Sequence, residues 1–393
     1  MIIIRKSVLI WAITMITLAI SQLCAAAADK GAFSTAPVKN SGKKWRIGYY
    51  EGGEYKDYQL TLIATIEGLM DLGWLEKSAI PPQNGIQTKA LWNWLAKDAK
   101  SEYLEFVADA HYSANWDDKI RGKMASDIIQ RLSQAKDLDL MIAMGTWAGK
   151  DIANSQHQTP TLVLSTSDPI AAGIIKSAED SGCDNVHARV DPLRHERQMR
   201  IFHDVIGFKK LGVFYEDTEA GRCYAALDKV QKVAAERGFE LIVCHTIDDV
   251  PDIKQAEESV IKCAEELSAK VDAIYVTQQN GVNAENLPKL VAVANKHHIP
   301  TFAQAGSEEV KEGILLSLSQ AGFKADGRFH AENIAKVFNG AKPRDLDQVF
   351  ESPPKIAINL ATASIIGFDP PVDVLGAADE IYQEIESSPQ KSQ

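Results

Sequence analysis

Residues 160–169 read Pro-Thr-Leu-Val-Leu-Ser-Thr-Ser-Asp-Pro, and this stretch decides the fold. Thr161–Leu164 is apolar and β-branched, which is typical of a short strand buried in a parallel sheet. Asp168-Pro169 ends the strand, because proline fixes φ and has no N–H. Ser165 and Thr166 then lie at the strand's carboxyl end, where open α/β sheets bind ligands. The stretch therefore predicts a ligand-contacting loop and the first crossing between two lobes, although an ordinary strand-to-helix turn with a serine N-cap also fits.

Strands and helices alternate on both sides of this stretch, as in proteins built from parallel sheets with right-handed crossovers. The expected strands are Trp45–Tyr50, Leu104–Ala108, Leu140–Met144, Leu211–Tyr215, Glu240–Thr246, Ala273–Val276, Thr301–Ala303, Ile314–Leu318 and Lys355–Asn359. A chain of 393 residues is too long for one ordinary core, so two domains are expected. The predicted fold class is therefore α/β, with two Rossmann-like parallel-sheet lobes joined by a three-stranded hinge.

Each expected lobe combines two pieces of the chain. Residues 45–167 and about 316–345 form the first lobe, residues 168–315 and about 346–385 form the second, and residues 386–393 are a tail. Residues 75–116 are an insertion in the first lobe, with a helix expected at Lys89–Lys97. Its aromatic residues are Trp92, Trp94, Tyr103, Phe106, Tyr112 and Trp116. We expect them to pack as a satellite cluster, with cover of a cleft between the lobes as the alternative.

The N-terminus has the pattern of a secretory signal peptide. Arg5 and Lys6 are basic, Val8–Leu23 is apolar, and Ala25–Ala28 supplies small residues for cleavage. Residues 1–28 are therefore predicted to be removed on export, and residues 29–44 to form a flexible leader. A retained membrane anchor, or a lipoprotein modified at Cys24, are the weaker alternatives. Export predicts a periplasmic location.

Four cysteines remain after the predicted cleavage, namely Cys183, Cys223, Cys244 and Cys263. An oxidising compartment permits two disulfides among them, in any of three pairings, and the spacing does not choose a pairing. Buried free thiols fit the sequence equally well. The spacing does not suggest a zinc site.

Charge and motifs limit the possible functions. The net charge of −11 argues against nucleic acid and anionic membrane surfaces as partners. The sequence has no G-x-G-x-x-G after a strand, no Walker lysine loop, no G-x-S-x-G elbow and no H-E-x-x-H. We therefore expect no cofactor, no metal site and no enzymatic activity.

Polar loops follow most of the predicted strands, and they supply the candidate ligand contacts. Hydroxyls, amides and helix N-terminal N–H groups at such edges can hold a small polar ligand, and aromatic rings can wall it. The candidate residues are Tyr49, Tyr50, Gly145, Thr146, Trp147, Ser165, Thr166, Tyr215, Gln278, Gln279, Asn280 and Gln304. Taken singly, each is more often a turn or capping residue than a ligand contact.

Several stretches, in this order and spacing, resemble one known family. They include Glu67-Gly68-Leu69, Ser167–Gly173, Lys210–Tyr215, Val271–Val276 and Ile299–Ala303. The chain is similar to exported solute-binding proteins of ABC transporters with the type I periplasmic-binding fold, in the branch for tryptophan or tyrosine uptake. The resemblance implies a two-lobed receptor that closes on a small ligand and delivers it to a membrane permease. It also implies that Thr146, Ser165, Thr166 and the loop after Tyr275 line the cleft.

The chain departs from that family at two positions that suit an ammonium group. The residue before Asn280 is usually an aspartate and is Gln279 here, and the loop after Phe302 usually offers an acid but reads Gln304-Ala305-Gly306. Because a lost carboxylate–ammonium bond costs on the order of 1.5–3 kcal/mol, an amino-acid-like ligand that is neutral or anionic fits at least as well. Compensation by Glu51, Glu54 or Glu216 is the alternative. A periplasmic sensing module for a membrane signalling protein is the alternative function.

Overall fold

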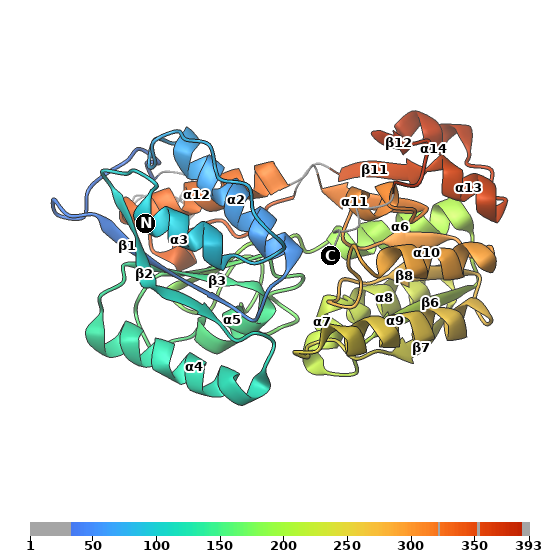
Figure 1. Ribbon diagram of the computed structural model, residues 1–393, viewed down its shortest axis with the longest axis horizontal. Helices are drawn as coiled ribbons and strands as arrows, with labels where there is room; N and C mark the ends of the chain where they lie inside the picture. Colours follow the sequence, from blue (N-terminus) through green and yellow to red (C-terminus); the bar gives the residue numbers. More distant parts are fainter. Residues whose placement is uncertain (1–32, 321–322, 352–353, 387–393) are drawn as a thin grey trace, which may run out of the picture.

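The computed structural model describes residues 33–320, 323–351 and 354–386. The predicted signal peptide, residues 29–32 of the leader and most of the tail lie outside these ranges. Within them, the chain forms two α/β lobes that lie side by side (Figure 1). No helix in the described ranges is both long and apolar enough to span a membrane.

The first lobe is built on a parallel sheet with strand order β2-β1-β3-β4-β5. The strands are β1 (Trp45–Glu51), β2 (Leu104–Ser113), β3 (Leu140–Met144), β4 (Thr161–Leu164) and β5 (Val186–Ala188). The helices of this lobe are α2 (Lys56–Asp71), α3 (Lys89–Lys97), α4 (Asp118–Gln130, continued by a π-helical turn at Arg131–Ala135), α5 (Gly145–Ile152) and α12 (Phe323–Phe338). The predicted strands at β3 and β4 and the predicted helix at α3 are confirmed.

The second lobe is built on a sheet with strand order β12-β11-β10-β9-β8-β6-β7, in which β10 and β11 are antiparallel. The strands are β6 (Lys210–Tyr215), β7 (Glu240–His245), β8 (Ala273–Val276), β9 (Thr301–Ala303), β10 (Leu316–Gln320), β11 (Pro354–Asn359) and β12 (Glu380–Tyr382). The helices are α6 (Arg194–Ile206), α7 (Glu219–Tyr224), α8 (Leu227–Arg237), α9 (Ile253–Ser268), α10 (Leu287–Lys296), α11 (Ser307–Lys311), α13 (Leu360–Ile366) and α14 (Val372–Ala377). The α/β fold with two lobes is therefore confirmed.

The chain passes between the sheets at places other than those expected. β5 pairs with β4, so the first lobe continues to Ala188 instead of ending at residue 167. The Asp168 side chain caps a turn within that lobe, accepting hydrogen bonds from the N–H groups of Ile170 and Ala171. β10 pairs with β9 and β11, so it belongs to the second lobe and not to the first. The sequence did not reveal β5 because three residues carry too little periodicity to mark a strand.

Two of the segments that connect the lobes run side by side. Val190 forms a parallel bridge with Val349. The Val190 N–H donates to the Gln348 carbonyl at 2.8 Å, and the Phe350 N–H donates to the Val190 carbonyl at 3.0 Å. The third passage lies between β10 and α12. The C-terminal third of the chain therefore contributes to both lobes (Figure 1).

The aromatic insertion belongs mainly to the core of the first lobe. Trp92 and Phe106 are buried with Ile47 and Leu62 between the sheet and its helices. The indole N–H of Trp92 donates to the carbonyl of Val107 at 3.0 Å. Packing of the insertion, the preferred interpretation, therefore holds for these rings. Trp116 is different, because it packs on Trp147, whose indole N–H bonds to the second lobe.

Helix α12 is attached to the first lobe by close packing on α2. A Cβ on Gly327 would lie 2.3 Å from the carbonyl carbon of Ala64. A Cβ on Gly68 would lie 2.8 Å from the Cβ of Ala331. The absence of side chains at both glycines therefore allows the two helices to approach.

The substitution Gly327→Ala is expected to lower the free energy of unfolding by about 1–3 kcal/mol, because its methyl group has no space against the backbone of α2. Gly122→Ala is the matched control. Gly122 is an exposed glycine in α4 with open space around it, so alanine there should stabilise by about 0.5–1 kcal/mol. Urea denaturation of both variants measures the difference, and equal effects would show that the helices do not depend on the glycine.

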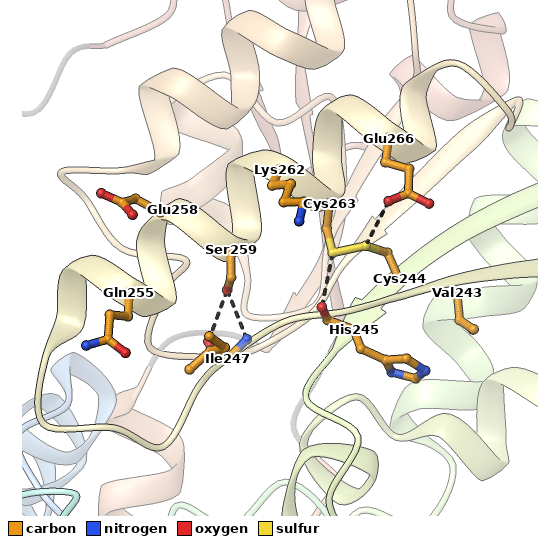
Figure 2. A pocket seen from close by; sticks show the side chains of 10 residues that line it. All are labelled: Val243, Cys244, His245, Ile247, Gln255, Glu258, Ser259, Lys262, Cys263 and Glu266. Carbon is orange, nitrogen blue, oxygen red and sulfur yellow. Dashed lines mark hydrogen bonds between the residues drawn. A yellow bond between two sulfur atoms is a disulfide. The ribbon is translucent and has the colours of Figure 1, made fainter.

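One disulfide is present in the second lobe. Cys244 on β7 is bonded to Cys263 on α9, with the Cα atoms 5.6 Å apart (Figure 2). Cys183 and Cys223 are free thiols as far as the described residues show. The sequence allowed either two disulfides or free thiols. The described residues contain one disulfide and two free thiols, so the structure lies between these alternatives. A hollow lined by β7 and α9 lies beside the disulfide.

The double substitution Cys244→Ala with Cys263→Ala is expected to destabilise the protein by about 3 kcal/mol, because the bond closes a loop with a sequence separation of 19. Cys183→Ala is the control, because this half-buried thiol has no disulfide partner. Denaturant unfolding under oxidising conditions checks the result. An unchanged midpoint for the double variant would contradict a stabilising role.

Candidate functional site

The two lobes contact each other through side chains near the carboxyl ends of their strands. The indole N–H of Trp147 on α5 donates to Asp249 Oδ2, in the loop after β7, at 2.8 Å. Gln278, after β8, donates through Nε2 to Asp57 Oδ2 on α2 at 3.2 Å. Lys150 and Glu219 form an ion pair at 2.8 Å, which joins α5 to α7. Figure 1 shows α5 on the side of the first lobe that faces α7.

Residues of the first lobe hold the Trp147 ring that bonds to the second lobe. Arg121 Cζ lies 4.1 Å from the centroid of the Trp147 ring, which is a cation–π contact. The Trp116 ring packs edge to face with the Trp147 ring, and the two centroids are 5.4 Å apart. Helix α5 starts directly after β3 at Gly145, whose φ of +83° and closeness to the Tyr58 hydroxyl exclude a side chain.

Trp116 has a backbone conformation that bulky residues rarely adopt. Its φ is +56°, and that of the preceding Asn115 is +52°. The ring lies on the Gly52-Gly53 backbone, where a Cβ on Gly53 would be 2.5 Å from ring atoms. The indole N–H donates to the Glu54 carbonyl at 3.1 Å. Such strain costs about 1–3 kcal/mol and concentrates at ligand sites, so Trp116 is a candidate contact that the packing interpretation missed.

Four acidic residues gather at the same interface. Asp57 lies in the first turn of α2, Asp248 and Asp249 follow β7, and Glu309 lies on α11. We call these four residues the carboxylate cluster. Tyr55 and Tyr58 lie near these acids. Burial raises the pKa of both phenols, and the charges of the cluster, together with Glu51 in the case of Tyr58, raise it further. The Tyr55 and Tyr58 rings pack edge to face, with centroids 5.2 Å apart.

The partners of the carboxylate cluster are neutral. Asp57 accepts from Gln278. Asp248 accepts from the Asn280 N–H at 2.6 Å. Asp249 accepts from the Trp147 indole and from the Tyr224 hydroxyl, the latter at 3.1 Å. Oε2 of Glu309 is buried and has no hydrogen-bond partner among the described residues.

Burial shifts the acidity of all four groups. It raises the pKa of Asp249 from 3.8 to about 7 and that of Glu309 from 4.5 to about 8. Burial also raises the pKa of Asp57. The pKa of Asp248 is well above its ordinary value, first because of burial and second because of the charge of neighbouring Asp249. Asp57, Asp249 and Glu309 keep part of their surface accessible although both lobes surround them. A cation at this place would remove the cost of their charge.

The glutamines at the predicted contact positions mainly organise the loops. Gln279 is buried, accepts from Thr246 Oγ1 and donates to Thr277 Oγ1, both at 2.8 Å. Gln304 is fully buried, accepts from the Gln278 N–H at 2.8 Å and donates to the Tyr224 carbonyl at 2.7 Å. Among the amide residues of these loops, Gln278 and Asn280 reach the carboxylate cluster.

The prediction for Tyr49 and Tyr50 is wrong in its geometry. Both rings are completely buried and pack on opposite faces of the sheet, because side chains alternate along a strand. The Tyr49 hydroxyl donates to Glu51 at 2.7 Å, and the Tyr50 hydroxyl donates to Asp151 at 2.8 Å. They are core residues and not a wall of the interface.

The remaining predicted residues lie near the strand ends and differ in burial and in the contacts that they make. Thr146 is buried in the first turn of α5. Tyr215 packs edge-on against His245, with ring centroids 5.2 Å apart. Ser165 is half-buried with a φ of +55°, and Oγ1 of neighbouring Thr166 is buried without a hydrogen-bond partner. These positions are compatible with ligand contact, which stays a prediction.

Arg194 is a further residue at this interface that the sequence pattern did not mark. Its Nη2 donates to the Gln304 carbonyl at 3.2 Å, and its Nε is buried with no hydrogen-bond partner in the described ranges. Its charge lowers the pKa of Asp57 against the larger effect of burial. The acid pair after β7 could have been noticed, since it directly follows a predicted strand. Glu309 could not have been found from the sequence, because its closeness to the other acids depends on where α11 packs in the folded chain.

These features define a two-lobed binding protein with the type I periplasmic-binding fold. The chain belongs to the ABC transporter substrate-binding protein family, whose model matches residues 107–382. The predicted family is thereby confirmed. Members of the family bind solutes, outside the cytoplasm in the case of ABC importers.

Relatives and solved structures agree with this assignment. A tyrosine-binding protein of Clostridioides difficile (strain R20291) is 26% identical over 228 residues, which are 56% of this chain and 61% of that protein. The match therefore spans less than two thirds of the relative. A Streptococcus pneumonia domain in complex with L-Trp has a TM-score of 0.66 at 20% identity, and the match covers 86% of this chain and 100% of that one. The ligand-free, open structure of a Clostridium difficile substrate-binding protein with adhesive properties has a TM-score of 0.57 at 20% identity, with the same coverage.

Asp249→Asn is expected to change how stability depends on pH. Because burial raises the pKa of Asp249 to about 7, the folded protein binds more protons at this group than the unfolded chain between about pH 4 and pH 7. The free energy of unfolding should therefore fall as pH rises through this window, and the variant lacks this loss. The melting temperature of the variant relative to the wild type should therefore rise between about pH 4 and pH 7.

The difference between the two proteins cancels buried histidines such as His111 and His195, whose lowered pKa values act in the opposite direction. Asp252→Asn, at the exposed start of α9, controls for the loss of one negative charge and keeps an N-cap side chain. A pH-independent difference for Asp249→Asn would show that burial does not perturb this carboxyl.

Proposed function

We propose that this chain is an exported solute-binding protein that closes its lobes on a small molecule with a cationic nitrogen and delivers it to an ABC permease. The carboxylate cluster carries the proposal. Asp57, Asp248, Asp249 and Glu309 approach from both lobes, and none of them forms an ion pair within residues 33–320, 323–351 and 354–386. Buried charge without an opposite charge is unfavourable, and a ligand cation would supply the missing partner.

An amino acid with an aromatic side chain is the ligand class that we propose. A tyrosine-binding protein and a domain solved with L-Trp are among the similar proteins, and both named ligands have an ammonium group and an aromatic ring. Tyr58, Trp116 and Tyr224 lie beside the carboxylate cluster and offer ring faces and edges. Thr166 Oγ1 and Arg194 Nε offer further polar contacts.

The glutamines at positions 279 and 304 do not exclude a ligand with an ammonium group. Gln279 and Gln304 lack the acids expected there, but the loop after β7 places Asp248 and Asp249 next to Asn280. Asp57 and Glu309 add carboxylates from α2 and α11. Carboxylates on neighbouring elements therefore replace the two missing acids as partners for an ammonium group. An anionic ligand fits poorly among these negative charges. We further propose that the ligand is bound without chemical change.

L-tyrosine or L-tryptophan is expected to stabilise the mature protein in thermal denaturation. Ligand at about one hundred times its Kd should add about 2.7 kcal/mol. Asp57→Asn should weaken binding about 10- to 100-fold, because a charge-assisted hydrogen bond is lost. Asp71→Asn, at the exposed far end of the same helix, is the matched control and should bind like the wild type.

The deaminated acids of the same rings, 3-(4-hydroxyphenyl)propionate and indole-3-propionate, test the role of the nitrogen. Neither should stabilise the protein. Binding of these acids as tightly as the amino acids would rule out the carboxylate cluster as the binding group. Recovery of a chemically altered ligand would contradict the proposal of binding without turnover.

A further inference from the structure

The charges at the interlobe site are unequal, and this inequality goes beyond what an amino-acid ligand requires. Four carboxyl groups surround the site. The cations whose charges act on them are the half-buried Arg194 on Asp57, the exposed Lys56 on Asp57 and Glu309, and Arg121 on Asp249. An amino acid carries one positive and one negative group. Its ammonium could pair with one or two carboxylates, but its own carboxylate would meet the remaining acids.

Other cations at the interface are committed to other carboxylates. Arg121 binds Asp151 through two nitrogens at 2.9–3.1 Å. Lys150 pairs with Glu219 at 2.8 Å. Lys229 lies 3.8 Å from Asp168. These three cations therefore form no ion pair with the carboxylate cluster in the described residues. Lys56 acts on Asp57 and Glu309 from the exposed surface, where water screens its charge.

Glu309 shows most directly that the site has acceptor capacity to spare. In the part of the chain that the structure describes, its Oε2 is buried without a hydrogen-bond partner, although the residue lies on the second lobe near Tyr55 and Asp57 of the first. Asp57 itself holds one bond across the interface, from an amide. A donor between α2 and α11 could bind both carboxyl groups.

Aromatic groups complete the surroundings of this place. Tyr55 and Tyr58 pack edge to face beside the cluster, and the Tyr58 and Trp116 rings are 6.2 Å apart. Tyr224 donates its hydroxyl to Asp249. Carboxylates combined with ring faces favour organic cations, because both interact well with positive charge and poorly with negative charge.

We infer that the interlobe site prefers ligands of net positive charge, so that an aromatic amine without a carboxylate binds more tightly than the zwitterionic amino acid. The inference rests on the proposed function, because it assumes that the carboxylate cluster receives the ligand's nitrogen. It adds that the ligand carboxylate weakens binding. The four acids of the cluster outnumber Arg194 and the exposed Lys56, the two cations that could face that carboxylate.

Titration calorimetry at neutral pH with three ligands of each ring tests the inference. The phenol series is tyramine, L-tyrosine and 3-(4-hydroxyphenyl)propionate, and the indole series is tryptamine, L-tryptophan and indole-3-propionate. Within at least one series, the amine should bind about ten-fold or more tightly than the amino acid, and the acid should bind weakest. Rising salt should weaken the amine more than the amino acid.

Each outcome separates the inference from the proposed function. An amino acid that binds more tightly than its amine overturns the inference and leaves the proposed function standing. An acid that binds as tightly as its amino acid overturns the proposed function. If no compound of either series binds, both are wrong.

Two substitutions connect the preference to its residues. Glu309→Gln or Asp57→Asn should reduce the ratio of amine to amino-acid affinity about ten-fold, because each removes one negative charge from the site. Glu308→Gln, on the exposed side of the same short helix, should leave the ratio unchanged. An unchanged ratio in Glu309→Gln and Asp57→Asn would show that the cluster does not set the preference.

Discussion

The enclosure of carboxyl groups between two lobes is the constraint on which the rest of the site depends. A carboxylate removed from water is unstable unless a cation or several donors face it. Here the donors are neutral: an indole, a phenol, an amide side chain and a backbone N–H. Such donors hold the groups in place but do not neutralise them, so burial raises their pKa values. A site of this kind is suited to receive a positive group.

The two lobes share this constraint, because two of the carboxyl groups accept a hydrogen bond from the opposite lobe. Asp57 belongs to the first lobe and its amide donor to the second, whereas Asp249 belongs to the second and its indole donor to the first. The connecting segments keep the lobes together, and α12 anchors the C-terminal part of the chain to α2 by close backbone packing. A change in the separation of the lobes therefore changes the surroundings of Asp57 and Asp249.

Much of the fold was predictable because local patterns report it. The apolar runs of β3 and β4 and the pattern of α3 mark their own ends, so these elements agree with the expected ranges. The β5 strand was missed because three residues form a strand only beside a neighbour. The sheet to which β10 belongs was misassigned, because pairing partners are not written in a strand's own residues. The position of the first crossing between the lobes was wrong for the same reason.

The amino-acid sequence alone determined the alternation of strands and helices, the family resemblance and the polar loops at the strand ends. These properties arise from residues close together in the chain. Only the tertiary structure decided that Tyr49 and Tyr50 are core residues, that Cys244 bonds Cys263, and that acids from α2, α11 and the loop after β7 meet. The physical reason is that burial and charge depend on which distant segments surround a group, and folding brings those segments together.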